Sequence, residues 1–326
     1  SMQCPYYVHT SLTYLFGLPA DRVRIIQTET GGGFGGKEDY PSMIAAHAAL
    51  VAYKTGRPAK LVYDREEDMA CTTKRHPSET TVEAGFDANG RLVALSLDVA
   101  MNGGAYCTLS PVVLSRGVIH AGGAYDCPHI DIVGKSYATN LVPFGAYRGF
   151  GAPQTLFAIE AHMDKCAEVL GIDPVELRRR NLMKEGSITS TGQDLGTDVA
   201  ARETMEHALR MASWDERKAA HAKFNATHAT KKRGLGLSVV LHGSGFTGNG
   251  EKKLRSRAKV DTLPDGRVRA LAANTEMGQG TKTVFAQILA QALGLELDDV
   301  VVAQPDTAIV PDSGPTVASR TVMVVG

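Results

Sequence analysis

Four glycine-centred loops contain the residue types and spacing best suited to binding a cofactor. They occupy residues 31–38, 145–154, 275–280 and 314–319. Glycine allows positive φ and a close approach of the backbone to a ligand. Free N–H groups at a helix start favour an anion such as a phosphate or an oxo-metal group. Together, the four loops predict a large anionic cofactor that is held mainly by the backbone.

The first loop, Gly-Gly-Gly-Phe-Gly-Gly-Lys-Glu, differs from two common phosphate-binding motifs. Its spacing to Lys37 is wrong for a Walker A loop, and no serine or threonine follows that lysine. It is also not a Gly-x-Gly-x-x-Gly dinucleotide loop with an acidic residue about 20 positions further on. A tight turn remains the alternative for this loop alone, and a generic nucleotide-binding module remains the alternative for all four.

Helices and strands are predicted around these loops from hydrophobic spacing, caps and turns. The expected helices span residues 6–18, 42–55, 155–170, 203–223 and 278–293, and a further one starts at residue 174. The expected strands span residues 23–27, 60–63, 80–86, 92–101, 234–241, 255–263, 268–273 and 300–303. Gly56, Gly171 and Gly294 are positioned to end helices, and Asp173 to begin one.

The two halves of the chain have a similar predicted organisation. Each contains a β-hairpin and a glycine loop that leads into a helix, with hairpin turns at residues 88–90 and 264–266. We therefore expect an α+β fold of two similar subdomains, each a mixed β-sheet with packed helices. The expected subdomains are residues 1–210 and residues 211–326, the second being incomplete at its C-terminus.

The composition indicates a globular protein and excludes several classes of function. The 326 residues are 43% hydrophobic, and 35 lysines and arginines balance 35 aspartates and glutamates. This charge gives no argument for binding nucleic acid or an anionic membrane. No apolar run approaches the ~20 residues of a membrane span, and no secretory signal is visible. The five cysteines form no C-x-x-C pair, which argues against iron–sulfur and zinc-ribbon sites and suits a cytoplasmic protein with reduced thiols.

Six motifs resemble, in order along the chain, the molybdenum hydroxylase family that contains xanthine dehydrogenase and aldehyde oxidase. They are GGGFGGKE at 31–38, NGGAY at 102–106, YRGFGAPQ at 147–154, KKRG at 231–234, TEMGQG at 275–280 and PTVAS at 315–319. The resemblance implies an internal portion of a catalytic subunit, in which both subdomains bind molybdopterin. Arg320 and Thr321 after the last motif resemble bacterial, xanthine dehydrogenase-like members.

The resemblance implies an oxidoreductase that inserts a water-derived oxygen at a carbon next to nitrogen in a purine-like heterocycle. An aldehyde oxidoreductase is the alternative within the family. Molybdenum would be held through the pterin and not by a protein ligand, and the pterin would be of the cytosine dinucleotide form. Iron–sulfur clusters and FAD are expected on partner subunits or domains.

The resemblance also implies roles for individual residues. Glu38 and Arg116 would be catalytic, with Glu38 binding the heterocycle and Arg116, opposite it, orienting the ring and stabilising negative charge. Phe150 and Phe246 would clamp a flat substrate, and the Thr247 hydroxyl would lie near its carbonyl. The expected cofactor contacts are Gln3, Gly33, Phe34, Gly35, Arg148, Met277, Gly278, Gln279, Gly280, Thr316, Val317, Ala318 and Ser319.

Other interpretations remain open. Taken alone, Glu38 could cap a helix, the two phenylalanines could belong to the core, and Arg116 could be a surface residue. The pairing of Glu38 with Arg116 favours purine-like substrates over aldehydes. The family's general base is a glutamate far downstream, and this chain ends at Gly326 before any such residue. We therefore expect the chain alone to be inactive; a scaffold fragment that only binds partner subunits is a further alternative.

Overall fold

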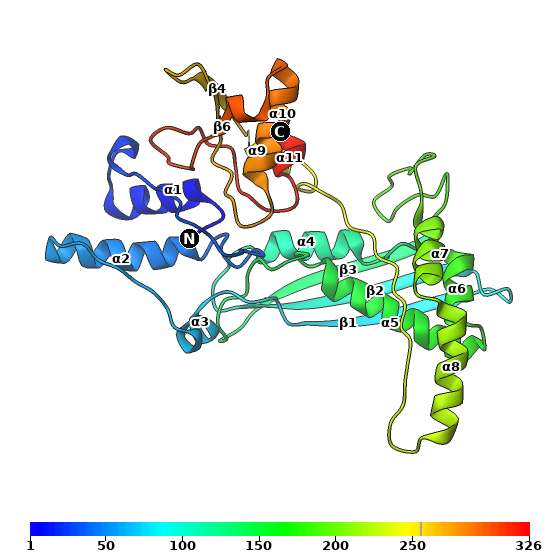
Figure 1. The fold of residues 1–326 in the computed structure, drawn as a ribbon. Helices are drawn as coiled ribbons and strands as arrows, with labels where there is room; N and C mark the ends of the chain where they lie inside the picture. Colours follow the sequence, from blue (N-terminus) through cyan, green and yellow to red (C-terminus); the bar gives the residue numbers. More distant parts are fainter. Residues whose placement is uncertain (255) are drawn as a thin grey trace.

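The computed structural model describes residues 1–254 and 256–326. Within them, the chain forms two small mixed β-sheets with helices packed around them (Figure 1). In each sheet the first two strands are antiparallel, and the third is parallel to the second. The first sheet consists of β1 (Ser78–Phe86), β2 (Leu92–Gly104) and β3 (His129–Ala138). The second consists of β4 (Lys259–Thr262), β5 (Val268–Leu271) and β6 (Val300–Val302). The predicted α+β class with mixed sheets and packed helices is confirmed.

One face of the first sheet carries a large hydrophobic core. In β2, Leu95, Leu97 and Val99 are buried, whereas Ser96 and Asp98 between them are exposed. Side chains on a strand alternate between faces, so this pattern directs one face to the core and the other to solvent. The alternation explains why the sequence predicts this strand well.

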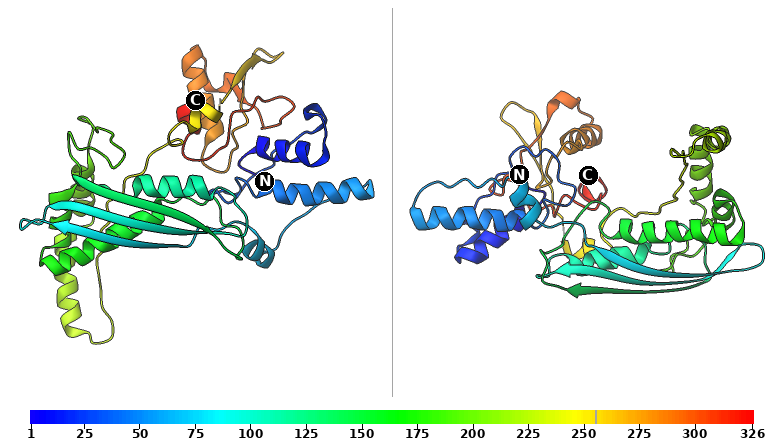
Figure 2. Two further views of the ribbon diagram at one scale, coloured as in Figure 1. Left: turned by 180° about the vertical axis from the view of Figure 1, so that it is seen from behind. Right: turned by 90° about the horizontal axis from the view of Figure 1, so that it is seen from below.

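Helices α4 (Ser110–His120) and α5 (Ala152–Leu170) cover the buried face side by side (Figure 2, right). Their side chains Val113, Ile159 and Met163 belong to the same core as the buried β2 residues. The sheet and the two helices therefore form a layered scaffold, and α4 runs along the edge of this scaffold that lies nearest the glycine loops (Figure 1).

Three helices follow α5 at the other end of the scaffold. They are α6 (Pro174–Asn181), α7 (Ala201–Met211) and α8 (Trp214–Thr227). The predicted N-cap of α6 is confirmed, because the Asp173 carboxylate accepts hydrogen bonds from the Val175 and Glu176 N–H groups at 2.9 and 3.2 Å.

The N-terminal segment packs against the second sheet. The Tyr6 hydroxyl donates to the Val310 carbonyl at 2.6 Å, although 304 positions separate them. The Gln27 N–H donates to the Pro305 carbonyl at 3.0 Å. The elements of this region are α1 (Pro5–Phe16), η1 (Ala20–Arg22), α2 (Pro41–Thr55), α9 (Gly250–Leu254), α10 (Thr281–Leu293), η2 (Leu297–Asp299) and α11 (Thr321–Val325). The division into subdomains of residues 1–210 and 211–326 stays a prediction. Residues 1–30 pack beside the second sheet, although they precede the first sheet in the sequence.

Several predicted elements are confirmed at their ends. Gly56, Gly171 and Gly294 all follow helices and have φ values of 66°, 64° and 67°. These are left-handed conformations that favour glycine at a helix C-terminus. Within the described ranges, no helix is long and apolar enough to cross a membrane.

Some predicted elements are wrong. Residues 23–27 make an isolated bridge through Ile26 and not a strand, while residues 60–63 and 234–241, all of them described, join neither sheet. A short apolar run predicts an extended chain, but a strand also needs a neighbouring strand to pair with. The strand expected at 255–263 begins outside the described residues, and within its described part only Lys259–Thr262 forms a strand, β4.

Other elements were divided wrongly or missed. The helix predicted at 203–223 is two helices, because Ser213 has a φ of 46° and interrupts it. Helix α3 (Arg65–Cys71), helix α4 and strand β3 were not predicted. The omission of α4 matters for the site, because this helix carries Arg116.

Candidate functional site

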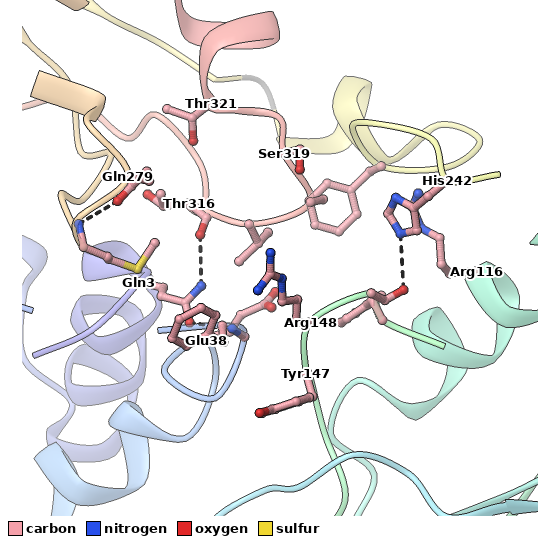
Figure 3. Close-up of a pocket in the computed structure, with 18 of the residues that line it drawn as sticks. Gln3, Glu38, Arg116, Tyr147, Arg148, His242, Gln279, Thr316, Ser319 and Thr321 are labelled. Atoms are coloured by element: carbon pink, nitrogen blue, oxygen red, sulfur yellow. Dashed lines mark hydrogen bonds between the residues drawn. The ribbon is translucent and has the colours of Figure 1, made fainter. Parts of the chain in front are cut away.

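A cavity of about 450 Å³ lies where the four glycine loops meet (Figure 3). Gln3, residues of α4, α10 and α11, and the loop at 242–247 also contribute to its wall. The predicted residues that line it are Gln3, Phe34, Gly35, Glu38, Arg116, Arg148, Phe150, Phe246, Thr247, Met277, Gln279, Thr316, Val317, Ala318 and Ser319. The structure therefore brings the expected substrate and cofactor positions together, while their roles stay predictions.

The lining differs from the prediction in a few positions. Among the described residues, the predicted cofactor contacts that do not line the cavity are Gly33, Gly278 and Gly280. The lining residues that sequence reasoning missed are Val112, Tyr147, Gly149, His242, Thr281, Val284, Thr321 and Val322. Tyr147 and Gly149 lie inside the YRGFGAPQ motif, which could have identified them. No sequence motif identifies Val112 or His242 as site residues, because only tertiary packing brings them to the cavity.

Gln3 joins the first and fourth loops. Its side-chain Oε1 accepts hydrogen bonds from the N–H groups of Gly35 and Lys37 at 3.0 and 3.2 Å. Its Nε2 donates to the Thr316 carbonyl at 3.0 Å. Gln3 is only 3% exposed, so its side chain is held in place and the three bonds keep the two loops at a defined spacing.

A side chain at Gly33 would collide with the N-terminal segment and with the third loop. A Cβ atom at this position would lie 2.6 Å from the Gln3 side chain and 2.7 Å from the Met277 Sδ. Either distance is well below a normal van der Waals contact. Gly33 thus determines the shape of the cavity without lining it.

Strained backbone conformations gather around the cavity. Among the described non-glycine residues, positive φ occurs at Phe34, Phe150, Ser213, Ala318 and Ser319. Four of these five line the cavity, and their φ values are 53° or 54°. Such conformations cost free energy and persist only where surrounding contacts enforce them, typically at functional sites.

Glu38 is a buried carboxyl group beside the first loop. It is 2% exposed, and this burial raises its pKa to about 8, with a smaller contribution from the neighbouring Asp39. The folded protein therefore holds Glu38 largely protonated at neutral pH. A protonated carboxyl group can donate as well as accept a hydrogen bond, which suits it to a polar ring edge.

Arg116 contacts the backbone of the 242–247 loop. Its Nη1 donates to the Gly243 carbonyl at 2.9 Å, and its Nη2 donates to the Gly245 carbonyl. Among the described residues it forms no ion pair with Glu38. Two of its five N–H donors are thus used by the protein, and the expected position opposite Glu38 relative to a substrate stays a prediction.

The third loop is closed by its own side chains. The Glu276 carboxylate accepts hydrogen bonds from the N–H groups of Gly278, Gly280 and Lys282 at 2.7, 3.1 and 3.2 Å. These donors surround the start of α10, where a negative charge is favourable. Because Glu276 already occupies these donors, they are not free to bind an anion, and the Met277 and Gln279 side chains are the part of this loop that lines the cavity.

A basic group also lies among the loops. The Arg148 guanidinium is 5.8 Å from the centre of the Phe34 ring, and Figure 3 shows it at the middle of the cavity. A guanidinium beside an aromatic ring can bind an anion or the polar edge of a flat molecule. Within the described ranges, no group of His, Cys, Asp and Glu side chains is arranged to hold a metal ion.

Comparison with known proteins relates this arrangement to one family. Two molybdopterin cofactor-binding domain profiles match residues 1–182 and 207–326. The chain is 35% identical over 305 residues to xanthine dehydrogenase/oxidase of Felis catus, covering 94% of this chain and 23% of that protein. It is 35% identical over 309 residues to a probable xanthine dehydrogenase subunit of Bacillus subtilis, covering 95% of this chain and 40% of that subunit.

A solved structure has the same fold. The aldehyde oxidoreductase from Desulfovibrio gigas superposes with a TM-score of 0.83 at 30% identity, over 98% of this chain and 34% of that one. The chain spans less than half of the length of each of these three proteins.

Proposed function

We propose that this chain forms the substrate and cofactor walls of a molybdenum hydroxylase acting on purine-like heterocycles. The chain belongs to the molybdopterin cofactor-binding family that contains xanthine dehydrogenase and aldehyde oxidoreductase. The observation that carries this proposal is the cavity that Glu38, Arg116, Phe150 and Phe246 line together with all four glycine loops. These side chains come from distant parts of the sequence, so their meeting in one cavity supports a shared function.

The loops have properties that fit a bulky, anionic pterin cofactor. The cavity has strained backbone at Phe34 and Ala318, and the absence of a Cβ at Gly33 makes room for the loops to converge. In addition, the Arg148 guanidinium lines the cavity beside the Phe34 ring, where it can bind an anionic group. Gln3, Gln279 and residues 316–319 would hold the cofactor, which we propose to be the cytosine dinucleotide form.

A bound molybdenum–pterin group would supply the oxidising power for inserting a water-derived oxygen at a carbon next to nitrogen. The chain's own residues would position the substrate. Phe150 and Phe246 would flank a flat ring, while protonated Glu38 would hydrogen-bond its polar edge. The Arg116 N–H groups not used by the 242–247 loop would stabilise developing negative charge on the substrate. Thr247 would lie beside a ring carbonyl.

The experiment uses the complete subunit with its partner subunits, which we expect to carry the iron–sulfur and FAD groups. Molybdenum content is measured first, and then turnover of xanthine, hypoxanthine, nicotinate and an aldehyde. We expect Glu38→Ala, which removes the hydrogen-bonding group, to lower purine turnover about 100-fold, and to leave the molybdenum content unchanged. Glu83→Gln on the exposed face of β1 is the control and should change neither.

Two outcomes would replace the proposal with an alternative. Turnover of aldehydes only, unaffected by Glu38→Ala, would indicate an aldehyde oxidoreductase, as the similarity to the Desulfovibrio gigas enzyme also permits. A native assembly without molybdenum would indicate a scaffold that binds partner subunits.

A further inference from the structure

We propose that His120 is a positioning residue that, together with Arg116, fixes the 242–247 loop as the substrate-facing wall of the cavity. The two residues lie one helical turn apart on α4. His120 does not itself line the cavity, so this role would extend the binding site to a residue behind its wall. The inference rests on the proposed function for its effect on substrate binding, but the loop contacts can be tested separately.

The 242–247 loop needs anchors because it belongs to no helix or sheet. It supplies His242, Phe246 and Thr247 to the cavity wall. Gly245 has a φ of 79°, which favours glycine and interrupts any regular structure. Backbone groups that lack a strand or helix partner must find other hydrogen bonds, and their partners then determine where the loop lies.

Arg116 and His120 together bond both backbone groups of Gly243. The Arg116 Nη1 donates to the Gly243 carbonyl at 2.9 Å, and the His120 Nε2 accepts from the Gly243 N–H at 3.2 Å. The Arg116 Nη2 extends the contact to the Gly245 carbonyl. A planar guanidinium with two outward donors is well suited to bridging two carbonyls.

The hydrogen bonds of His120 specify its tautomer. The backbone N–H of Gly243 can only donate, so Nε2 must be an acceptor. The Arg116 carbonyl, 2.8 Å from Nδ1, can only accept, so Nδ1 must carry the proton. Burial, with Arg116 and His242 close by, lowers the pKa of His120 and favours this neutral form. The ring is therefore a cross-link with one donor aimed at the helix and one acceptor aimed at the loop.

The loop also contacts two of the glycine loops. The His242 ring, which stacks on His120 at 5.2 Å between centroids, has its Nε2 3.3 Å from the Gly149 carbonyl (Figure 3). The Gly245 N–H donates to the Ala318 carbonyl at 2.7 Å. A shift of the loop away from α4 would therefore move the Phe246 and Thr247 wall relative to the other loops.

The first test replaces the ring and measures the loop directly. In the complete enzyme, His120→Leu removes the acceptor, and hydrogen exchange of peptides covering residues 242–249 should become faster by roughly tenfold. His120→Gln places an amide oxygen near the position of Nε2 and should restore protection to within about threefold. The matched control is His162→Leu. His162 is a half-buried histidine of α5 that does not line the cavity, so its replacement should leave the exchange of these peptides unchanged.

The second test uses substrate kinetics with the same variants. His120→Leu should raise KM for the heterocycle about tenfold and change kcat by less than about threefold, because wall position affects binding more than the chemical step. Unchanged exchange or unchanged KM in His120→Leu would overturn the proposal, as would equal losses in His120→Leu and His120→Gln. If His120→Leu does not fold, His120→Asn replaces it, because asparagine is too short to reach Gly243.

The two proposals can fail independently. If the wild-type enzyme does not turn over heterocycles, the proposed substrate class is wrong, and hydrogen exchange still decides whether His120 fixes the loop. If turnover is present but exchange at residues 242–249 does not depend on His120, only the positioning role is wrong.

Discussion

The two three-stranded sheets share a strand order, but different contacts stabilise them. The first has long strands and a large core that includes Leu97 and Ile159. The second has strands of four, four and three residues, with a small cluster around Leu271. A second small cluster forms where Val300 of β6 packs on Ala286 and Ala290 of α10. Polar contacts with the N-terminal segment, such as the hydrogen bond between Gln27 and Pro305, add to these clusters.

The two regions are therefore expected to contribute differently to the protein, the first to its folding stability and the second to the binding of cofactor and substrate. The first sheet is a scaffold that holds α4 and α5 through hydrophobic burial. The second sheet supports loops whose positions depend on side-chain clamps, glycines and strained backbone. The cavity lies between the two regions, so we expect substitutions in the scaffold to reduce folding stability and substitutions among the loops to reduce cofactor or substrate binding.

The largest expected effect tests the difference in core size. Leu97 and Leu271 are 1% and 2% exposed, one in each sheet. Leu97→Ala should lower the free energy of unfolding by about 4 kcal/mol, and Leu271→Ala by about 2 kcal/mol, because a small cluster can collapse around the lost side chain. Denaturant unfolding of both variants measures the two values. Equal losses would show that the second sheet has a core as rigid as the first.

A slightly smaller effect is expected at the buried ion pair of the scaffold. Glu160 pairs with the fully buried Arg178 at 3.0 Å, and it also accepts a hydrogen bond from the Val239 N–H of the connecting segment. Glu160→Gln should lower the free energy of unfolding by about 3 kcal/mol, because it leaves a buried charge poorly compensated. The surface pair of Glu176 and Arg180 provides the control, where Glu176→Gln should cost below about 0.5 kcal/mol. Similar losses in both variants would contradict this assignment.

Among the loops, Gly33→Ala should affect binding more than folding. The added Cβ would collide with Gln3 and Met277, so we expect the molybdenum content of the purified enzyme to fall roughly tenfold. Gly36→Ala lies in the same loop, where a Cβ would meet only the Gly33 carbonyl at 3.5 Å, and should retain normal content. Equal metal content in the two variants would show that the cofactor does not depend on this convergence of loops.

The smallest expected effect is the change in stability for a step of one pH unit. Burial raises the pKa of Glu38 from 4.5 to about 8, so between these values the folded protein keeps a proton that the unfolded chain has released. Stability should therefore fall as pH rises through this window, by about 1 kcal/mol per pH unit from this group. Glu38→Gln cannot titrate and should show a flatter dependence in urea unfolding. Identical slopes for the variant and the wild type would show that Glu38 is charged throughout.

Local features of the fold could be predicted from the sequence with good accuracy. The glycines that end α2, α5 and α10 and the aspartate that begins α6 were identified correctly, because caps depend on a few neighbouring residues. The strands expected at 60–63 and 234–241 were wrong, because strand formation depends on a partner elsewhere in the chain. The site residues came from motif resemblance, which does not specify their contacts.

By itself the sequence determined the four glycine loops, the helix ends and the family to which these motifs belong. Tertiary structure decided how the loops meet, because Gln3 and Thr316 lie 313 positions apart yet share a hydrogen bond. It also decided the state of the chemical groups. Glu38 has its raised pKa only because distant segments exclude water, and Arg116 meets Gly243 only because α4 packs beside a loop 127 positions further along. Burial and long-range contacts depend on the whole fold, whereas caps and glycine conformations are encoded within a few residues.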